Sequence, residues 1–124
     1  MAKILIVDDS SFARMRISHM LQEAGYDTVE AVDGREGVAM AQQELPDCIL
    51  SDLLMPEMDG ISLLAALREL GFNLPVIVLT ADIQESKRQQ CGELGAAGFL
   101  SKPPQGKVLL ALVEKVLAER GEKG

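Results

Sequence analysis

The chain has 124 residues, of which 48% are hydrophobic, and this composition provides one sizeable core without room for a second domain. The formal net charge is −7, and no basic cluster exceeds the pair Lys87–Arg88, which argues against direct binding of DNA or RNA. The sequence contains no apolar run of about 20 residues and opens without a signal peptide, so we expect a cytoplasmic protein with no membrane insertion.

The first half of the chain alternates short apolar runs with helical periodicity. Residues 3–7 are apolar on both faces, as in a strand of a parallel sheet, and the run stops at Asp8 and Asp9. A serine-capped helix is predicted to follow and to stop at Gly25. The same pattern predicts a weaker strand over 27–31, a helix over 35–44 and a third strand over 48–52.

The second half continues the alternation and completes five repeats. The predicted elements are a helix over 61–70, the clearest strand over 75–80, a polar helix over 84–94, a short strand over 98–100 and a last helix over 104–119. Strict alternation predicts right-handed crossovers and an α/β fold, a doubly wound (βα)5 parallel five-stranded sheet. We expect one domain over residues 1–124, with 121–124 as a short tail.

Polar side chains follow four of the five predicted strands. The first strand ends in Asp8 and Asp9, the third in Asp52 and the fourth in Thr80, while the fifth runs out to Lys102. Ligands of doubly wound sheets bind beyond these carboxyl ends. Two carboxylates ~4 Å apart repel by about 4 kcal/mol at an effective dielectric of ~20, so three together favour a bound cation over three independent solvated groups. Oxygen-only ligands indicate a hard ion such as Mg²⁺.

Four segments containing these residues occur in a specific order. They are Ile4–Ser10 (ILIVDDS), Asp52–Gly60 (DLLMPEMDG), Val76–Ala81 (VIVLTA) and Gly95–Pro103 (GAAGFLSKP). Over essentially its full length the sequence resembles the receiver domain of two-component response regulators. The resemblance implies a flavodoxin-like sheet with strand order 2-1-3-4-5. It also implies a stand-alone signalling module that catalyses only its own phosphorylation and dephosphorylation, rather than an enzyme.

The resemblance also implies the roles of the acidic residues. Asp52 would be the phosphoacceptor, a carboxylate nucleophile that forms an acyl phosphate. Asp8, Asp9, Asp52 and the backbone carbonyl of Leu54 would hold Mg²⁺, for which Mn²⁺ could substitute. Phosphoryl transfer depends mainly on positioning and charge neutralisation, which such a site would supply.

The remaining site residues are implied to bind the phosphoryl group and to transmit its presence. Lys102, followed by an expected cis bond to Pro103, would pair with phosphoryl oxygens, and Thr80 would donate a hydrogen bond to one of them. Phe99 would fill the space that Thr80 leaves and so reshape the face made by the fourth helix, fifth strand and fifth helix. A plain packing role for Phe99 stays open. The implied partners are a sensor histidine kinase or histidine phosphotransfer protein and a downstream target protein at that face.

Other classes of protein remain as alternatives. The chain could be a receiver fragment of a larger regulator or hybrid kinase. A small aspartyl-phosphate phosphatase of the haloacid-dehalogenase type would place its nucleophile in a DxD motif after the first strand, whereas Asp8 is followed by Asp9 and Ser10. A flavodoxin-type carrier would need a phosphate-binding loop at that position, where two aspartates would repel a phosphate.

The sequence also supports predictions for five side chains outside the main site. Apolar Leu54 would fail to orient a hydrolytic water and so lengthen the phosphoryl lifetime, while Asp82 could act in either direction. His19 is expected on the surface, with no carboxylate partner evident in the sequence, and it is assigned no phosphodonor role. Cys48 and Cys91 are far apart in sequence and are expected as buried, reduced thiols.

Overall fold

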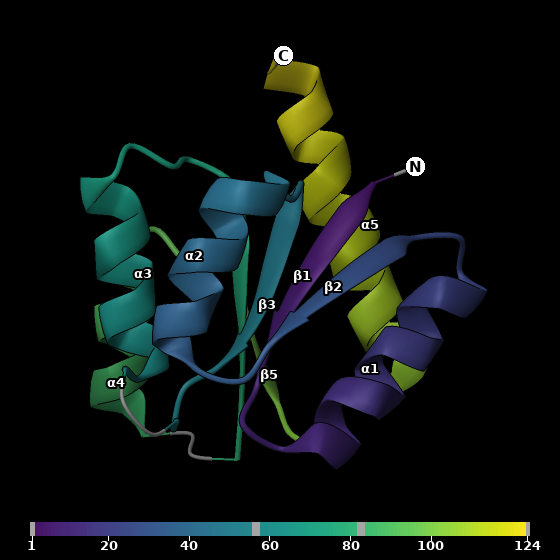
Figure 1. The fold of residues 1–124 in the computed structure, drawn as a ribbon, viewed down its shortest axis with the longest axis horizontal. Coiled ribbons are helices and arrows are strands. Elements are labelled where there is room, and N and C mark those ends of the chain that lie inside the picture. The colour runs from purple at the N-terminus through teal and green to yellow at the C-terminus, as the bar shows by residue number, and fades with distance from the viewer. Residues whose placement is uncertain (1, 56–57, 82–83, 124) are drawn as a thin grey trace.

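A computed structural model describes residues 2–55, 58–81 and 84–123, and over these residues five strands alternate with five helices (Figure 1). The elements are β1 (Lys3–Val7), α1 (Ser11–Glu23), β2 (Asp27–Ala31), α2 (Gly34–Glu44), β3 (Cys48–Asp52), α3 (Gly60–Glu69), β4 (Val76–Thr80), α4 (Glu85–Glu93), β5 (Gly98–Ser101) and α5 (Gly106–Lys123). All strand pairs are parallel, in the order β2-β1-β3-β4-β5, which confirms the predicted fold. None of the described helices is long and apolar enough to cross a membrane.

The central strands are apolar on both faces because helices cover both faces. Helices α1 and α5 lie on one side of the sheet, and α2, α3 and α4 lie on the other (Figure 1). Alternate residues of β1 divide between the two cores: Ile4 and Ile6 pack with α1 and α5, whereas Leu5 and Val7 pack with α2 and α3. Each fully buried aliphatic side chain contributes about 1.5–3 kcal/mol. This two-sided core fixes the register, and with it the strand ends that form the site.

Side-chain caps start the helices next to the carboxyl ends of the strands. Ser10 accepts a hydrogen bond from the amide of Ala13, Asp33 from that of Glu36, and Asp59 from that of Ser62. Each cap satisfies one of the free amides of its first helical turn. These caps fix where α1, α2 and α3 begin after β1, β2 and β3.

The last helix differs from the expectation at both ends. It begins at Gly106 rather than at Pro104, and it continues through Lys123, so the prediction of a tail over residues 121–124 is wrong for 121–123; Gly124 lies outside the described residues. Glutamate and lysine are good helix formers, and one glycine near a helix end costs only about 1 kcal/mol. With no proline or capping turn in this stretch, the helix extends to its last described residue.

Candidate functional site

Three carboxylates meet at the carboxyl edge of the sheet, the lower edge in Figure 1. Oxygen atoms of Asp8, Asp9 and Asp52 all lie within 4.8 Å of one another. The first two follow β1 and the third ends β3, and these strands are neighbours in the sheet. Asp8 is 1% exposed and Asp52 is 8% exposed, whereas Asp9 faces solvent. The structure therefore brings together the three acids that the sequence predicted.

Lys102 bridges two of these carboxylates. Its Nζ lies 2.5 Å from Asp8 Oδ2 and 3.3 Å from Asp52 Oδ2. Burial alone would lower the pKa of Lys102, but the hydrogen bond to Asp8 and the charges of Asp52 and Asp8 outweigh it and raise the pKa. Lys102 is therefore charged at neutral pH. The bond from Lys102 to Pro103 is cis, as expected.

Asp52 is held in a crowded position. Its Oδ1 accepts a hydrogen bond from the amide of Leu53 at 2.7 Å. A β-carbon added to Gly60 would lie 2.4 Å from the carbonyl oxygen of Asp52, so only glycine fits there. Burial raises the pKa of Asp52, and repulsion from Asp8 adds to this effect, while Lys102 acts against it. The carboxylate is thus less stable here than in water, although Lys102 is beside it.

The donor set fits a divalent cation. All three acids offer oxygen atoms, which Mg²⁺ prefers, and their mutual spacing is close to that of ligands around one small ion. Three carboxylates and one ammonium leave a net charge of −2, which one divalent ion neutralises. Leu54 lies two residues after Asp52 in the sequence, and its side chain is 51% exposed.

Thr80 lies at the same edge, whereas Phe99 lies opposite Val78, two residues before the end of β4. Thr80 ends β4 and is fully buried, and its carbonyl oxygen accepts a hydrogen bond from the amide of Lys102. Phe99 on β5 is half-buried against a small cluster that contains Leu53 and Val78, and the guanidinium of Arg88 lies 5.4 Å from the centre of its ring. The ring therefore connects the site edge with α4.

The structure tests most of the predictions for side chains outside the main site. Cys48 and Cys91 are free and buried, as predicted, and burial raises the pKa of Cys48 to about 12. His19 is exposed, as expected, and it has a carboxylate partner that was not evident in the sequence, because its Nε2 lies 3.1 Å from Glu23 Oε1. The two residues are one helical turn apart, a spacing at which side chains meet. Asp82 lies outside the described residues.

Sequence reasoning missed two contacts that hold Asp8. The amide of Ser10 donates to Asp8 Oδ1 at 2.9 Å, and Arg14 Nη1 donates to the backbone carbonyl oxygen of Asp8 at 2.6 Å. A signal for the arginine existed in the sequence, since Arg14 lies one turn into a helix that begins beside an acidic strand end. Nothing in the spacing alone shows that its side chain turns back towards the strand.

Comparisons with known proteins agree with this geometry. Residues 4–114 match the family model described as the response regulator receiver domain. The chain is 37% identical over 123 residues to the protein PilH of Pseudomonas aeruginosa, covering 95% of this chain and 99% of PilH. It is 35% identical to the alkaline phosphatase synthesis transcriptional regulatory protein PhoP of Bacillus subtilis, but covers only 48% of that protein. The solved structure of the chemotaxis protein CheY4 of Vibrio cholerae superimposes with a TM-score of 0.89 at 41% identity, covering 94% of this chain and 98% of CheY4.

Proposed function

Since this chain belongs to the response regulator receiver domain family, we propose that it accepts a phosphoryl group on Asp52 in a Mg²⁺-dependent reaction and passes the signal on through protein contacts. The observation that carries the proposal is the cluster of Asp8, Asp9 and Asp52 beside Lys102. The chain matches 99% of PilH and 98% of CheY4, so the likeness covers the whole of these two relatives.

The geometry favours Asp52 as the nucleophile among the three acids. Asp8 is almost fully buried, and both of its carboxylate oxygens already accept hydrogen bonds, from Ser10 and Lys102. Asp9 is exposed, and its carboxylate has no hydrogen bond or ion pair among the described residues. Asp52 is held by one short hydrogen bond, and its Oδ2 has only the longer 3.3 Å contact with Lys102. The hydrogen bond from Leu53 therefore orients the carboxylate of Asp52 through Oδ1, while Oδ2 can still attack phosphorus.

The reaction assigns a task to each neighbouring residue. Asp8, Asp9, Asp52 and the carbonyl of Leu54 would hold Mg²⁺, which when bound supplies charge neutralisation for the transferred phosphoryl group. The carboxylate oxygen of Asp52 forms the new bond to phosphorus while the bond from phosphorus to the donor breaks. Lys102 then exchanges its contact with Asp52 for the phosphoryl oxygens.

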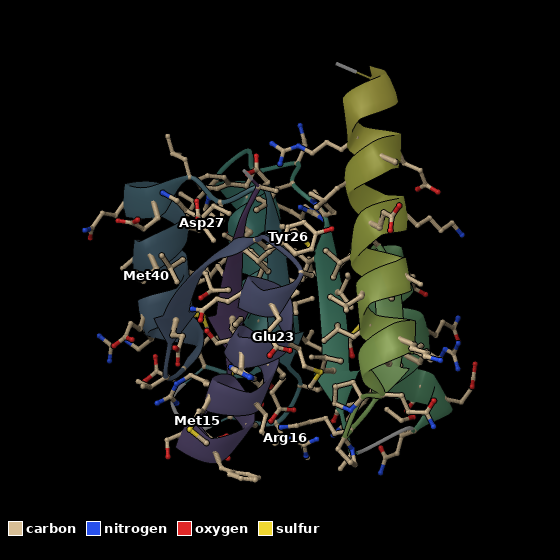
Figure 2. All side chains as sticks on the ribbon, turned by 90° about the vertical axis from the view of Figure 1, so that its right-hand side faces the viewer. Met15, Arg16, Glu23, Tyr26, Asp27 and Met40 are labelled. Atoms are coloured by element: carbon tan, nitrogen blue, oxygen red, sulfur yellow. The ribbon has the colours of Figure 1, made fainter. Side chains whose placement is uncertain are left out.

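The donor that we propose is a protein with a phosphorylated histidine, either a sensor histidine kinase or a histidine phosphotransfer protein. Its approach is supported by exposed apolar side chains at the start of α1, where Phe12 is 61% exposed and Met15 is 60% exposed. Figure 2 shows Met15 and Arg16 at this lower end of α1, near the carboxyl edge. Phe12 and Lys102 also line one shallow apolar hollow beside the site, which could receive a side chain of the donor.

The output face that we propose consists of α4, β5 and α5, with Thr80 and Phe99 as the switch. The half-buried ring of Phe99 supports this role, because its inner side packs against the cluster with Leu53 and Val78 while its outer side is open to solvent and to Arg88 of α4. A groove of the same face runs along Phe99, Leu100 and Val108 and fits a target protein. The free thiols of the chain fit the reducing environment of the cytoplasm.

An intact-mass experiment tests the proposal. The wild type and Asp52→Asn are incubated with acetyl phosphate in the presence of Mg²⁺ or EDTA. We expect one phosphoryl adduct on the wild type with Mg²⁺, and none on the variant or in EDTA. An adduct of equal yield on Asp52→Asn would overturn the assignment, and failure of the wild type to react under any condition would overturn the proposed function.

The alternative of an aspartyl-phosphate phosphatase is less well supported. A phosphatase of the haloacid-dehalogenase type carries its nucleophile in a DxD motif after the first strand, whereas Asp8 is followed by Asp9 and Ser10. We therefore propose that the module catalyses only its own phosphorylation and dephosphorylation. Turnover of a phosphate monoester by the wild type, lost in Asp52→Asn, would favour the phosphatase instead.

A further inference from the structure

Arg14 on α1 reaches back to the end of β1, although the proposed reaction assigns it no task. Its Nη1 donates to the backbone carbonyl oxygen of Asp8 at 2.6 Å, and its Nε donates to Glu30 Oε1 at 3.1 Å. The side chain is only 14% exposed, so burial also restricts it. A short charge-assisted hydrogen bond to one carbonyl is among the stronger single contacts in a protein.

The carbonyl that Arg14 holds belongs to the peptide between two proposed metal ligands. The carboxylate of Asp8 is fixed by Ser10 and Lys102. Asp9 has no hydrogen bond or ion pair of its own among the described residues. Because a peptide unit is planar, fixing the carbonyl oxygen of Asp8 also fixes the amide and the Cα direction of Asp9. The Ser10 amide on Asp8 Oδ1 fixes the peptide after Asp9, and Arg14 fixes the peptide before it, so Arg14 supplies one of the two backbone restraints on a ligand whose own side chain has none among the described residues.

We infer that Arg14 is a positioning residue of the metal site, which aims the Asp8–Asp9 peptide so that both carboxylates face the ion before it binds. This inference rests on the proposed function, because it takes the acidic cluster to be a Mg²⁺ site. Groups that orient metal ligands without touching the metal commonly change its affinity by about 10–100-fold.

The charge of Arg14 cannot explain a favourable effect on the metal. A cation beside a divalent ion repels it, and here the carboxylate of Glu30 neutralises the guanidinium. Removing only the charge of Arg14 would therefore leave metal affinity unchanged or raise it. Removing the hydrogen bond to the Asp8 carbonyl lowers the affinity if positioning matters, so the two explanations predict opposite signs.

Metal binding by the intact protein separates these explanations. Mn²⁺ serves as the probe, and its free concentration is measured by electron paramagnetic resonance during titration of four proteins: the wild type, Arg14→Met, Arg14→Lys and Glu30→Gln. Arg14→Met keeps the apolar stem but removes the donors, and we expect its Kd for Mn²⁺ to rise about tenfold. Arg14→Lys, which keeps one donor, should recover most of the loss. Glu30→Gln removes the ion pair and keeps the carbonyl contact, so its Kd should stay within about twofold of the wild type.

A second readout uses the dependence of phosphorylation on Mg²⁺. For Arg14→Met, the Mg²⁺ concentration that gives half the maximal rate with acetyl phosphate should rise by the same factor, while the rate at saturating Mg²⁺ stays near that of the wild type. Far-UV circular dichroism checks that each variant is folded. If Arg14→Met destabilises the protein too far, Arg14→Leu, which also lacks any donor, is titrated in its place, with a similar loss expected.

The other outcomes would overturn the inference. An unchanged or lower Kd for Arg14→Met would show that the carbonyl contact does not position the ligands. An equal loss in Glu30→Gln would assign the effect to the ion pair instead. Wild type that does not bind Mn²⁺ would refute the metal site and the proposed function as well, whereas the first two results would leave the proposed function intact.

Discussion

Replacing Asp52 by asparagine should stabilise the metal-free protein, although Asp52 is the central residue of the site. At an effective dielectric of about 20, the 3.3 Å contact with Lys102 attracts by about 5 kcal/mol, and repulsion from Asp8, within 4.8 Å, amounts to at least about 3.5 kcal/mol. Taking the carboxylate out of water costs several more kcal/mol. The raised pKa of Asp52 shows that burial and Asp8 together outweigh Lys102.

The asparagine variant keeps most of the favourable contacts. Its side-chain oxygen can still accept the hydrogen bond from the Leu53 amide, and Lys102 retains its shorter contact with Asp8. We therefore expect Asp52→Asn to raise the free energy of unfolding by about 1–2 kcal/mol in the absence of metal. Saturating Mg²⁺ should reduce or reverse the difference, because an ion at 100 times its Kd stabilises the wild type by about 2.7 kcal/mol and the variant lacks one ligand.

Urea unfolding followed by far-UV circular dichroism measures this effect at pH 7, first in EDTA and then in Mg²⁺. Asp47→Asn is the matched control, because Asp47 accepts a hydrogen bond from the Lys3 amide and lies near Arg120, with no carboxylate cluster around it. The control should be neutral or less stable in both buffers. If Asp52→Asn proves less stable than the wild type in EDTA, the site does not carry the electrostatic strain described above.

Four other changes have expected results that single measurements can check. The thiol of Cys48 has a pKa of about 12 in the folded protein and about 9 in the unfolded chain. The free energy of unfolding therefore keeps the full contribution of this thiol below about pH 9 and loses about 2 kcal/mol of it by pH ~10.5. In urea unfolding at different pH values, Cys48→Ala should remove that part of the pH dependence. Leu45 is 68% exposed with a φ of 48°, and Leu45→Gly should raise the thermal midpoint, with a gain of about 0.5–1 kcal/mol. Gly60→Ala should cost about 1–3 kcal/mol in urea unfolding and slow phosphorylation, because its β-carbon would collide with the Asp52 carbonyl. Leu54→Asn should shorten the half-life of the phosphorylated protein in a decay assay, and equal half-lives would refute a role for residue 54 in water access.

The sequence predicted the fold because local and global signals agree in this chain. Apolar runs such as residues 48–52 are buried on both faces, and their ends coincide with the polar residues of the site. Asp8, Asp9 and Asp52 could be predicted together because parallel strands bring their carboxyl ends to one edge. Lys102 is close to them for the same reason, although it is 50 residues away from Asp52 in the sequence.

The features that could not be predicted depend on where long side chains turn. Arg14 could have faced solvent, and only the packing of α1 against β1 and β2 places its guanidinium on the Asp8 carbonyl. His19 and Glu23 have a spacing that permits contact without requiring it. The left-handed backbone at Leu45 was equally hidden, since the sequence has no glycine there to mark the end of α2.

The most direct test of the central claim is to locate the phosphoryl bond. The wild type is phosphorylated with acetyl phosphate and Mg²⁺ and reduced with borohydride, which converts a phosphorylated aspartate to homoserine, and the peptides are then sequenced by mass spectrometry. We expect homoserine at position 52 and unmodified aspartate at positions 8 and 9. Homoserine at either of those two positions, or a phosphoryl group that survives borohydride on a serine or threonine, would contradict it.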